Sequence, residues 1–445
     1  MKKTILYGLL ALSLCACGDD TEDAPKRPDL PEIPTFTEGR RTVLVYMAAQ
    51  NSLGRGYHEQ DSIEIMAGRN YIADHDRLLL YIDDQDAPRI YRVSRHQDQP
   101  QLLKRWDKDV CSTDPKNFEE VLRFVKQHVP AEEYGLVMWS HADGWIPARD
   151  TDYDKYAEKE EIATDKSTYS FGIDSGPNGR LSNTGANMEV TDLAASITNA
   201  GLHCKFIFFD ACLMQNLEVA YALRHATDYL IAAPMSTPAA GSYYKHDIQH
   251  GFFAEDPSIL AQTYLNDVQS PELANSYSDY GLCISSIRTD RMEYLAQTLK
   301  EALPYSKLMG RQSPDMVVED LDKPGEERYV LNYQAFAPNY FYRPHNYDAL
   351  QSLRCILPEA HYEKVKAALL DAITFHGSTE KFWIGPTNWD YQYVPVKSGD
   401  YCGVSMFIPQ TLYTEIATHP KYSDVNKDFQ ATEWYKAAGF DVTGW

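Results

Sequence analysis

Cysteine, positive charge and long apolar runs are all scarce in this chain of 445 residues. Eight cysteines are too few for the disulfide framework that holds small secreted proteins together. The 42 Lys and Arg residues are outnumbered by 64 Asp and Glu, which gives a formal net charge of −22. Because nucleic-acid binding needs clusters of positive charge, we expect no nucleic-acid partner. Beyond the first 17 residues no apolar run reaches the length of a membrane span, which favours a large globular body.

The first residues have the pattern of a bacterial lipoprotein signal. Two lysines precede an apolar stretch, 5–14, that is too short to span a bilayer. Leu14-Cys-Ala-Cys17 then resembles a lipobox. We therefore expect residues 1–16 to be a signal peptide and Cys17 to carry lipid, which would anchor the protein to a membrane. The alternatives are an ordinary secretory signal cleaved nearby, or lipidation of Cys15.

Residues 17–39 are expected to form a tether. An acidic run, Gly18–Asp23, resembles the surface-export signal of lipoproteins in the Bacteroides group, although a plain solvated tether would look similar. Four prolines follow, which is typical of a semi-rigid spacer. We expect the protein to be held outside the cytoplasm, in the outer membrane and at the cell surface.

Two segments of similar form carry the chemistry. In Phe206–Tyr221 an apolar run ends at Cys212 and helical spacing follows, so Cys212 is expected where a buried strand gives way to a helix. Gly135–Trp145 is an apolar run that ends at His141. At matching strand ends, a thiol nucleophile and an imidazole base could act together. The alternative is that Cys212 is a small buried hydrophobe and His141 a satisfied turn residue.

At these residues the chain resembles the clostripain family of cysteine peptidases, within the caspase-like and gingipain-like clan. The resemblance covers about residues 40–300 well. It implies Cys212 as the nucleophile, His141 as the general base and acid, and the backbone N–H groups of Ala142 and Cys212 as the oxyanion site. The segments that carry it are Val43–Ala48 with Asn51 and Leu53, Trp139–Trp145, Ser170–Asp174, Met188–Leu193 and Phe209–Leu223.

The chain departs from the family in two places. The family usually has Gly after the catalytic His, and Ala142 fits there only at negative φ. Relatives often carry acidic residues near Met235 and Ser236, and this chain has none there. The resemblance assigns Asp210 to the substrate pocket, which favours Arg or Lys before the scissile bond. Alternatively, Asp210 is a buried carboxylate that hydrogen-bonds the turn.

Alternating strand and helix signals predict an α/β fold with a mostly parallel sheet. The resemblance implies a caspase-like three-layer α/β/α sandwich, with a peptidase domain at 40–305 and an α+β C-terminal extension packed on it at 306–445. The expected strands are 42–48, 77–83, 135–140, 206–210, 229–233 and 282–286. The expected helices are 57–67, 117–128, 190–200, 214–224, 259–268 and 291–303.

A long polar insertion, residues 146–187, separates the His and Cys motifs. In the clostripain-like family a segment at this point is cut during maturation, whereas the alternative is an uncut loop or lid. Basic positions that a cut could use are Arg149, Lys155, Lys159, Lys166 and Arg180. We expect no required cofactor and no metal site, and interpret His246 and His250 as solvated histidines. Ca²⁺ is a weaker hypothesis, because Asp150, Asp152 and Asp154 alternate like oxygen ligands.

The sequence therefore predicts a lipid-anchored cysteine endopeptidase with a Cys-His dyad and a thioester acyl-enzyme, acting on peptides or proteins. The alternative is a non-catalytic surface binding lipoprotein on a degenerate clostripain-like scaffold, which Ala142 and the missing acids suggest. Acyl transfer by the same dyad is a third hypothesis, since only the acceptor would differ.

Overall fold

The computed structural model describes part of the chain, and these residues belong to one compact unit, Ile33–Trp445. The described ranges are 33–34, 36–147, 170–177, 181–273, 280–309, 330–333, 346–383, 391–393, 401–411 and 424–444. Several predictions lie outside them: the signal peptide, the lipidation of Cys17, most of the tether, the basic cut positions and the aspartates proposed for Ca²⁺.

A nine-stranded sheet forms the centre of the described residues, in the order β12-β10-β9-β8-β5-β1-β2-β3-β4. Its middle strands pair in parallel: β9 (Thr227–Ala232), β8 (Cys204–Asp210), β5 (Ala131–Trp139), β1 (Gly39–Ala48) and β2 (Asp76–Asp83). Antiparallel strands complete both edges: β12 (Ile373–Ser378), β10 (Cys283–Arg288), β3 (Arg89–Val93) and β4 (Gln101–Arg105). The expected strands do not include β3, β4 and β12, because these short edge strands are partly exposed and lack long apolar runs.

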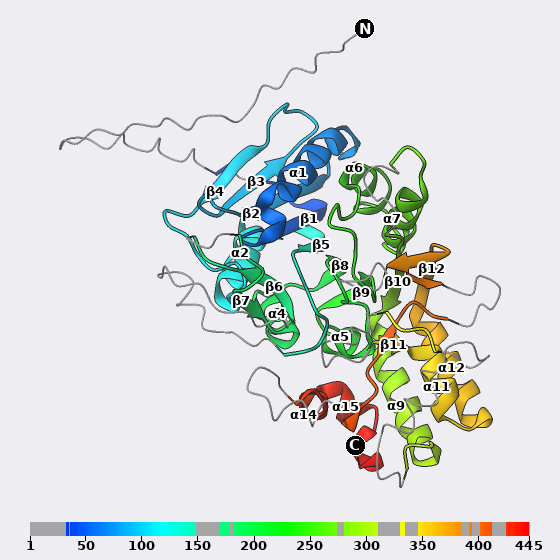
Figure 1. Cartoon of the computed structure of the whole chain (residues 1–445). Helices are drawn as coiled ribbons and strands as arrows, with labels where there is room; N and C mark the ends of the chain where they lie inside the picture. The colour runs from blue at the N-terminus through cyan, green and yellow to red at the C-terminus, as the bar shows by residue number, and fades with distance from the viewer. Residues whose placement is uncertain are drawn as a thin grey trace, which may run out of the picture. The chain divides into compact units, whose positions relative to one another are not determined.

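Helices cover both faces of this sheet, as Figure 1 shows. One layer contains α1 (Tyr57–Gly68), α6 (Tyr244–His246), the π-helical turn η3 (Asp247–Gly251) and α7 (Ile259–Gln269). The other contains α2 (Pro115–His128), α4 (Val190–Asn199), α5 (Leu217–Ala222), α9 (Met292–Ala302), α11 (Ala349–Ile356), α12 (Glu359–Ala372), α14 (Val425–Ala431) and α15 (Glu433–Ala437). Val43 and Val45 of β1 pack toward the first layer, and Leu44 and Tyr46 toward the second. The predicted three-layer fold is confirmed.

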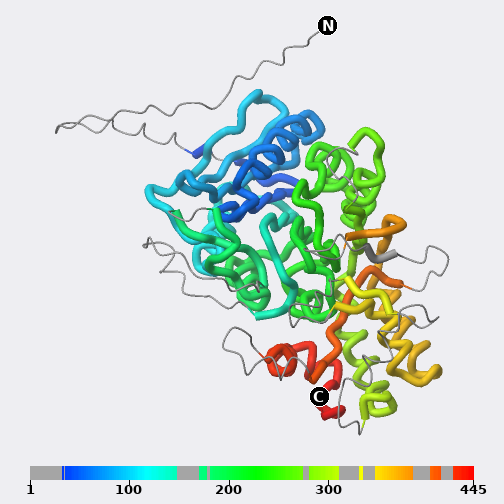
Figure 2. The backbone as a smooth tube through the Cα atoms, viewed as in Figure 1, coloured from blue at the N-terminus to red at the C-terminus, as the bar shows by residue number. Residues whose placement is uncertain are grey.

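Residues after 305 share this sheet and core where they are described. Strand β12 pairs with β10, and Trp434 of α15 packs on Tyr221 of α5 with ring centroids 5.6 Å apart. The smooth trace in Figure 2 shows where this part of the chain lies beside the earlier helices. Small two-stranded sheets join β11 (Tyr347–Asp348) to β15 (Ser405–Met406), β13 (Lys381–Trp383) to β14 (Tyr391–Tyr393), and β6 (Phe171–Asp174) to β7 (Ala186–Met188). The domain boundary that we place at residue 305 stays a prediction.

Helix α5 is shorter than the helix predicted over 214–224. It begins only at Leu217, because Asn216 caps it by accepting the N–H of Val219 at 3.0 Å. The preceding turn holds Leu213 at φ +62°, which no helix contains. Leu213 and Met214 are nevertheless buried, so hydrophobic spacing extended the prediction into the turn. The turn matters because it directly follows Cys212.

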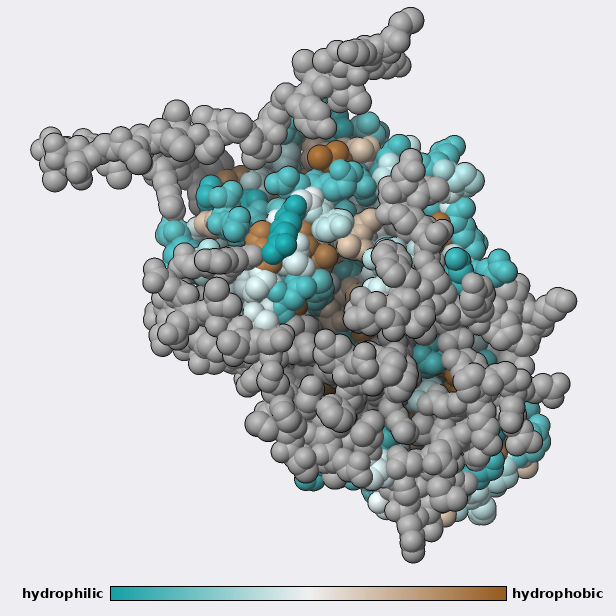
Figure 3. All heavy atoms as spheres, viewed as in Figure 1, coloured by the Kyte–Doolittle hydropathy of each residue, from teal (hydrophilic) through white to brown (hydrophobic). Residues whose placement is uncertain are grey.

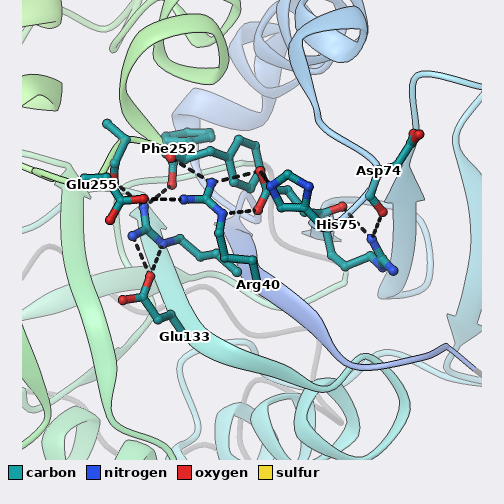
Figure 4. A network of polar contacts seen from close by, with 11 residues as sticks. Arg40, Asp74, His75, Glu133, Phe252 and Glu255 are labelled. Atoms are coloured by element: carbon teal, nitrogen blue, oxygen red, sulfur yellow. Dashed lines mark hydrogen bonds and ion pairs between the residues drawn. The ribbon is translucent and has the colours of Figure 1, made fainter.

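Two arginines of β1 neutralise carboxylates at the amino edge of the sheet, as Figure 4 shows. The buried Arg41 donates Nε–H to Glu133 of β5 at 2.9 Å and Nη1–H to Phe252 O at 3.1 Å. Arg40 makes a two-pronged pair with Asp76 of β2, at 3.0 and 2.9 Å. Such forked contacts between guanidinium and carboxylate are the strong form of ion pair, so this edge is fastened electrostatically.

Polar residues dominate the described part of the face shown in Figure 3, and apolar atoms form small patches between them. None of the helices in the described ranges is long and apolar enough to cross a membrane. The remaining short helical turns are η1 (Ser52–Arg55), η2 (Arg69–Tyr71), η4 (Thr289–Arg291), η5 (Leu303–Tyr305) and η6 (Phe440–Thr443).

Candidate active site

The structure brings the loops of His141 and Cys212 together. Strands β5 and β8 are parallel neighbours in which Trp139 pairs with Asp210, and His141 and Cys212 each lie two residues further on. Both residues therefore lie at the carboxyl edge of adjacent strands. The loops also pack closely, because a methyl group added to Gly144 would lie 2.9 Å from the carbonyl oxygen of Leu213. Gly144 also has φ +73°. Both the close contact and the positive φ therefore require glycine here.

Cys212 lies on a strained but well-anchored turn. Leu213 occupies the left-handed region, which costs a residue with a Cβ about 1–2 kcal/mol. Its N–H donates to Met235 O at 3.0 Å, and the N–H of Gln215 donates to Ala233 O at 3.1 Å. The end of β9 and the segment after it thus hold the turn in place. Backbone strain of this kind is frequent at functional sites, where contacts with the surrounding structure hold the residue in its unfavourable conformation.

Cys212 is a partly exposed residue, and its thiol touches Thr237. The backbone N–H of Thr237 donates to Sγ at 3.3 Å, and the Thr237 hydroxyl lies 3.7 Å from it. Burial raises the pKa of this thiol, while the Thr237 contacts act in the opposite direction. At neutral pH the resting residue is therefore a thiol. Among the described cysteines, Cys111, Cys204, Cys283 and Cys402 are buried, and Cys212 and Cys355 are partly exposed.

His141 is held by two polar side chains. Its Nε2 lies 3.0 Å from Ser52 Oγ, and Asn183 also hydrogen-bonds the imidazole. The N–H of Ser52 donates to Asn183 Oδ1 at 3.2 Å, so the three side chains form one small network. Burial lowers the pKa of His141 to about 4, which keeps the ring neutral and able to accept a proton at pH 7. The sequence analysis names neither Ser52 nor Asn183, since isolated polar residues in loops carry no pattern.

Buried polar groups fix the strand ends beneath the imidazole. Asn51 Nδ2 donates to Ala48 O at 2.8 Å and to Ile173 O at 2.9 Å. Ser140 Oγ donates to the same Ala48 carbonyl at 2.9 Å. These bonds join β1, β5 and β6 directly before His141. Because each buried polar group has a partner, the network adds rigidity to the loop.

Ala142 has the negative φ that an alanine needs at this position. In the described residues only Leu181 and Leu213 combine a side chain with positive φ, so Ala142 has negative φ. It pairs with Phe171 in an antiparallel bridge. The two hydrogen bonds of this bridge use other groups: Gly172 N–H donates to His141 O at 2.8 Å, and Asp143 N–H donates to Ser170 O at 3.3 Å. The bridge therefore does not consume the Ala142 N–H.

Asp210 is buried and bound to the segment that follows β9. Both carboxylate oxygens lie 3.2 Å from the N–H of Ser242, and Oδ2 accepts the Tyr244 hydroxyl at 3.0 Å. Burial raises the pKa of Asp210 to about 6, against the effect of these donors. Gly241 has φ +64°, and a methyl group there would lie 2.5 Å from Oδ2. Glycine thus allows the backbone to pack closely against the carboxylate.

Met235, near which relatives carry acids, is part of the apolar core in this protein. Met235 is fully buried, and its sulfur accepts the N–H of Cys283 at 3.1 Å.

His246 Nδ1 lies 2.6 Å from Asp267, beside the ring of His250. Within the described ranges no group of three or more His, Cys, Asp or Glu side chains is arranged to hold a metal ion.

Comparisons with known proteins agree with this arrangement. The model of the clostripain family matches residues 45–352, a range that contains both His141 and Cys212. No curated protein matches the chain.

Several solved structures are similar to the chain. One is a secreted C11 cysteine protease from Bacteroides thetaiotaomicron in complex with an irreversible peptide inhibitor (24% identity, TM-score 0.69, covering 91% of this chain and 99% of that one). Another is an inactive zymogen C11 protease from Parabacteroides distasonis (25% identity, TM-score 0.66, covering 91% of this chain and 99% of that one). A third is the secreted C11 protease iotapain from B. thetaiotaomicron (19% identity, TM-score 0.68, covering 90% of this chain and 99% of that one). At these identities the first and third show a shared fold.

Proposed function

Because the chain belongs to the clostripain family and is a cysteine peptidase, we propose that it is an endopeptidase whose catalytic dyad is Cys212 and His141. One observation carries the proposal: the two residues follow paired positions of adjacent parallel strands, on loops that pack against each other at Gly144. The partly exposed Cys212 thiol can meet a substrate there, whereas most of the other described thiols are buried.

The proposed reaction begins with two neutral groups. His141 takes the thiol proton as Sγ of Cys212 attacks the scissile carbonyl carbon, and the carbonyl oxygen becomes an oxyanion. The C–N bond then breaks, His141 gives its proton to the leaving amine, and a thioester remains. Water attacks the thioester while His141 takes one of its protons. The C–S bond breaks, and the proton returns to the thiol.

The backbone N–H groups of Ala142 and Cys212 are proposed to stabilise the oxyanion. Negative φ at Ala142 and a bridge that does not consume its N–H both support this role. Donors fixed before the reaction stabilise developing charge without reorganising, which is why such sites contribute strongly. The anchored turn at Leu213 would provide that rigidity on the Cys212 side.

Asp210 is proposed to favour Arg or Lys before the scissile bond. It lies two residues before the proposed nucleophile and has no cationic partner among the described residues. A cationic side chain that reached this carboxylate would lower the pKa of Asp210 from its raised value and gain a charge-assisted hydrogen bond. Comparable cleavage of peptides with Arg and Ala at this position would contradict the preference.

Lipid anchoring through Cys17 is proposed from the lipobox resemblance alone, and surface display from the acidic run that follows it. Two similar structures are described as secreted proteases, which supports a place outside the cytoplasm. We expect labelled palmitate to be incorporated into the wild type and not into Cys17→Ser. Equal labelling of both would contradict the anchor, and protease shaving of intact cells would test display.

Maturation by a cut within residues 146–187 is also proposed, with Arg149, Lys155, Lys159, Lys166 and Arg180 as the available basic positions. One similar structure is described as an inactive zymogen, which supports an activation step. We expect the wild type to convert to two fragments and Cys212→Ala to stay intact. A fully active single chain would contradict maturation by cleavage.

Ca²⁺ dependence is proposed from the aspartates at 150, 152 and 154. Unchanged activity in EDTA would contradict it.

An active-site probe tests the dyad directly. A thiol-directed peptide inhibitor should label the wild type but neither Cys212→Ala nor His141→Ala. Cys355→Ala is the matched control, because that thiol is also partly exposed but lies on α11. Labelling that persists in Cys212→Ala, or is absent from the wild type, would contradict the dyad and favour a binding protein on this scaffold.

A further inference from the structure

One segment late in the chain, which includes β15, contacts both of the loops that carry the proposed dyad. On the Cys212 side, the N–H of Ser405 donates to Gln215 O at 2.9 Å. Two residues further on, the N–H of Phe407 donates to Glu218 Oε1 at 3.0 Å. The late segment is therefore fastened at two points to the turn and the helix that follow Cys212.

On the His141 side the contact is aromatic. Trp145 lies four residues after His141, and its ring packs edge-on against Phe407 with the centroids 5.1 Å apart. Phe429 packs on both rings, at 5.7 Å from Trp145 and 4.9 Å from Phe407. All three side chains are buried. Such aromatic pairs contribute about 0.5–1.5 kcal/mol each beyond their burial, so the end of the His141 loop is firmly held.

Phe407 closes a ring of contacts around the proposed dyad. Its side chain holds the His141 loop through Trp145, and its backbone holds α5 through Glu218. The same two loops also meet directly at Gly144. Two loops that touch at one point can rotate about it, whereas loops joined at two separate points keep a fixed separation. Phe407 provides the second point.

The separation of the two loops matters for the chemistry. In the structure Sγ of Cys212 accepts the N–H of Thr237, and Nε2 of His141 lies beside Ser52 Oγ. The distance between thiol and imidazole therefore depends on the loops that carry them. Proton transfer needs the two groups within hydrogen-bond reach, and a misplacement of about 1 Å can cost a factor of about 100 in rate.

We propose that Phe407 is a positioning residue, which keeps the Cys212 turn and the His141 loop at the separation that proton transfer requires. The inference rests on the proposed dyad. It gives the C-terminal part of the chain a role in the reaction without a contact to the substrate. An aromatic side chain suits this role, because a ring provides a large rigid contact with only two rotatable bonds.

Phe407→Leu tests this role, because it keeps the backbone N–H and an apolar side chain but loses the ring. We expect kcat to fall about tenfold or more while KM changes less than about twofold. Phe440→Leu is the matched control, since Phe440 is also fully buried and packs on Phe429 at 5.2 Å and on Tyr435. Both variants should lower the melting temperature. Equal kcat per folded molecule in the two variants would overturn the inference.

The partner ring allows a rescue test. Trp145→Leu should lower kcat as much as Phe407→Leu, whereas Trp145→Phe keeps a ring and should retain about half of kcat or more. The double variant Trp145→Leu/Phe407→Leu should lie within about twofold of the lower single variant, because both substitutions break one contact. Losses that multiply would overturn the shared role. If Phe407→Leu does not fold, Trp145→Leu decides the same question.

Alkylation by iodoacetamide reports on the dyad without a substrate. Mass spectrometry separates the peptide that contains Cys212 from the one that contains Cys355, the other partly exposed thiol among the described residues. At pH 7 the Cys212 rate in Phe407→Leu should fall toward that of His141→Ala, and Phe440→Leu should react like the wild type. If the wild type and His141→Ala react equally, the dyad itself fails. If they differ and Phe407→Leu reacts like the wild type, the proposed function stands and only this inference fails.

Discussion

At the amino edge of the sheet, the carboxylates of Asp76 and Glu133 are neutralised by guanidinium groups. At the carboxyl edge, the carboxylate of Asp210 has no cationic partner in the described residues, whereas that of Asp84, directly after β2, pairs with Arg89 at 2.7 Å. Both edges belong to the same parallel strands, so the difference is not one of fold. The acid without a cationic partner is the one at the end of β8, two residues before Cys212. We infer that the amino edge is built for stability and that the carboxyl edge is left incomplete for a substrate.

Removing the proposed nucleophile should have the largest effect, and this effect should be confined to the carboxyl edge. Cys212→Ala should lower kcat by a factor on the order of 10⁴ or more, because a dyad works as a unit. The melting temperature should not fall, since the thiol makes only weak contacts with Thr237. Peptidase assays measure the loss of kcat, and calorimetry measures the melting temperature. Residual activity close to that of the wild type would place the chemistry elsewhere.

A substitution at the amino edge should have the opposite effect, lowering stability and leaving activity nearly unchanged. Arg41→Ala would leave the Glu133 carboxylate and the Phe252 carbonyl without their shared donor. Arg41 is buried but the Glu133 side chain is 35% exposed, so the freed carboxylate regains water; losing the hydrogen bonds and packing of the guanidinium should cost roughly 2 kcal/mol, which urea unfolding would detect. Activity per folded molecule should be nearly unchanged. A large drop in kcat at full folding would contradict the division between the edges.

Two matched Asp→Asn substitutions should change stability in opposite directions. Asp76→Asn loses the forked pair with Arg40 and should cost roughly 1–2 kcal/mol at pH 8. Asp210→Asn removes a buried charge that faces Tyr244, Asp61 and Asp247, and should gain roughly 1–2 kcal/mol at the same pH.

The pH dependence of Asp210→Asn follows from its pKa. The folded pKa of about 6 lies above the ordinary value of 3.8. The folded wild type therefore gains a proton as pH falls through 6, while the unfolded chain gains it only near 4. Wild-type stability from this group thus rises as pH falls from 7 to 4, and the advantage of the variant should vanish. A constant difference across this window, measured by urea unfolding, would contradict the assignment.

The smallest effect concerns the group that holds the imidazole. Ser52→Ala removes the hydroxyl 3.0 Å from His141 Nε2. Loss of one hydrogen bond of about 1 kcal/mol should lower kcat roughly fivefold, with KM unchanged. The acid limb of the kcat profile should also shift, since the environment of the imidazole changes. Ser62→Ala, on α1 with a backbone contact only, is the control and should change neither. A change in KM alone would indicate a substrate contact.

The buried centre of the fold was predictable from the sequence. Strands β1, β2, β5 and β8 are apolar on both faces, because helices cover both sides of the sheet. The same runs placed His141 and Cys212 at strand ends. Edge strands such as β3 and β12 were missed, since pairing with a neighbour, not burial, fixes them.

The finer parts of the site depend on contacts between distant segments. Ser52, Asn183 and Thr237 touch the dyad residues, yet none stands in a recognisable pattern. Asp210 itself was foreseen, but its hydrogen bonds to the segment after β9 were one of two open alternatives.

Digestion of a peptide library by the wild type, with Cys212→Ala as control, tests the central claim most directly. We predict cleavage by the wild type alone, with Arg and Lys enriched before the scissile bond. Such a result requires a working thiol at the carboxyl edge and an acidic pocket beside it. The same cleavages by Cys212→Ala, or wild-type cleavage without basic enrichment, would contradict the account.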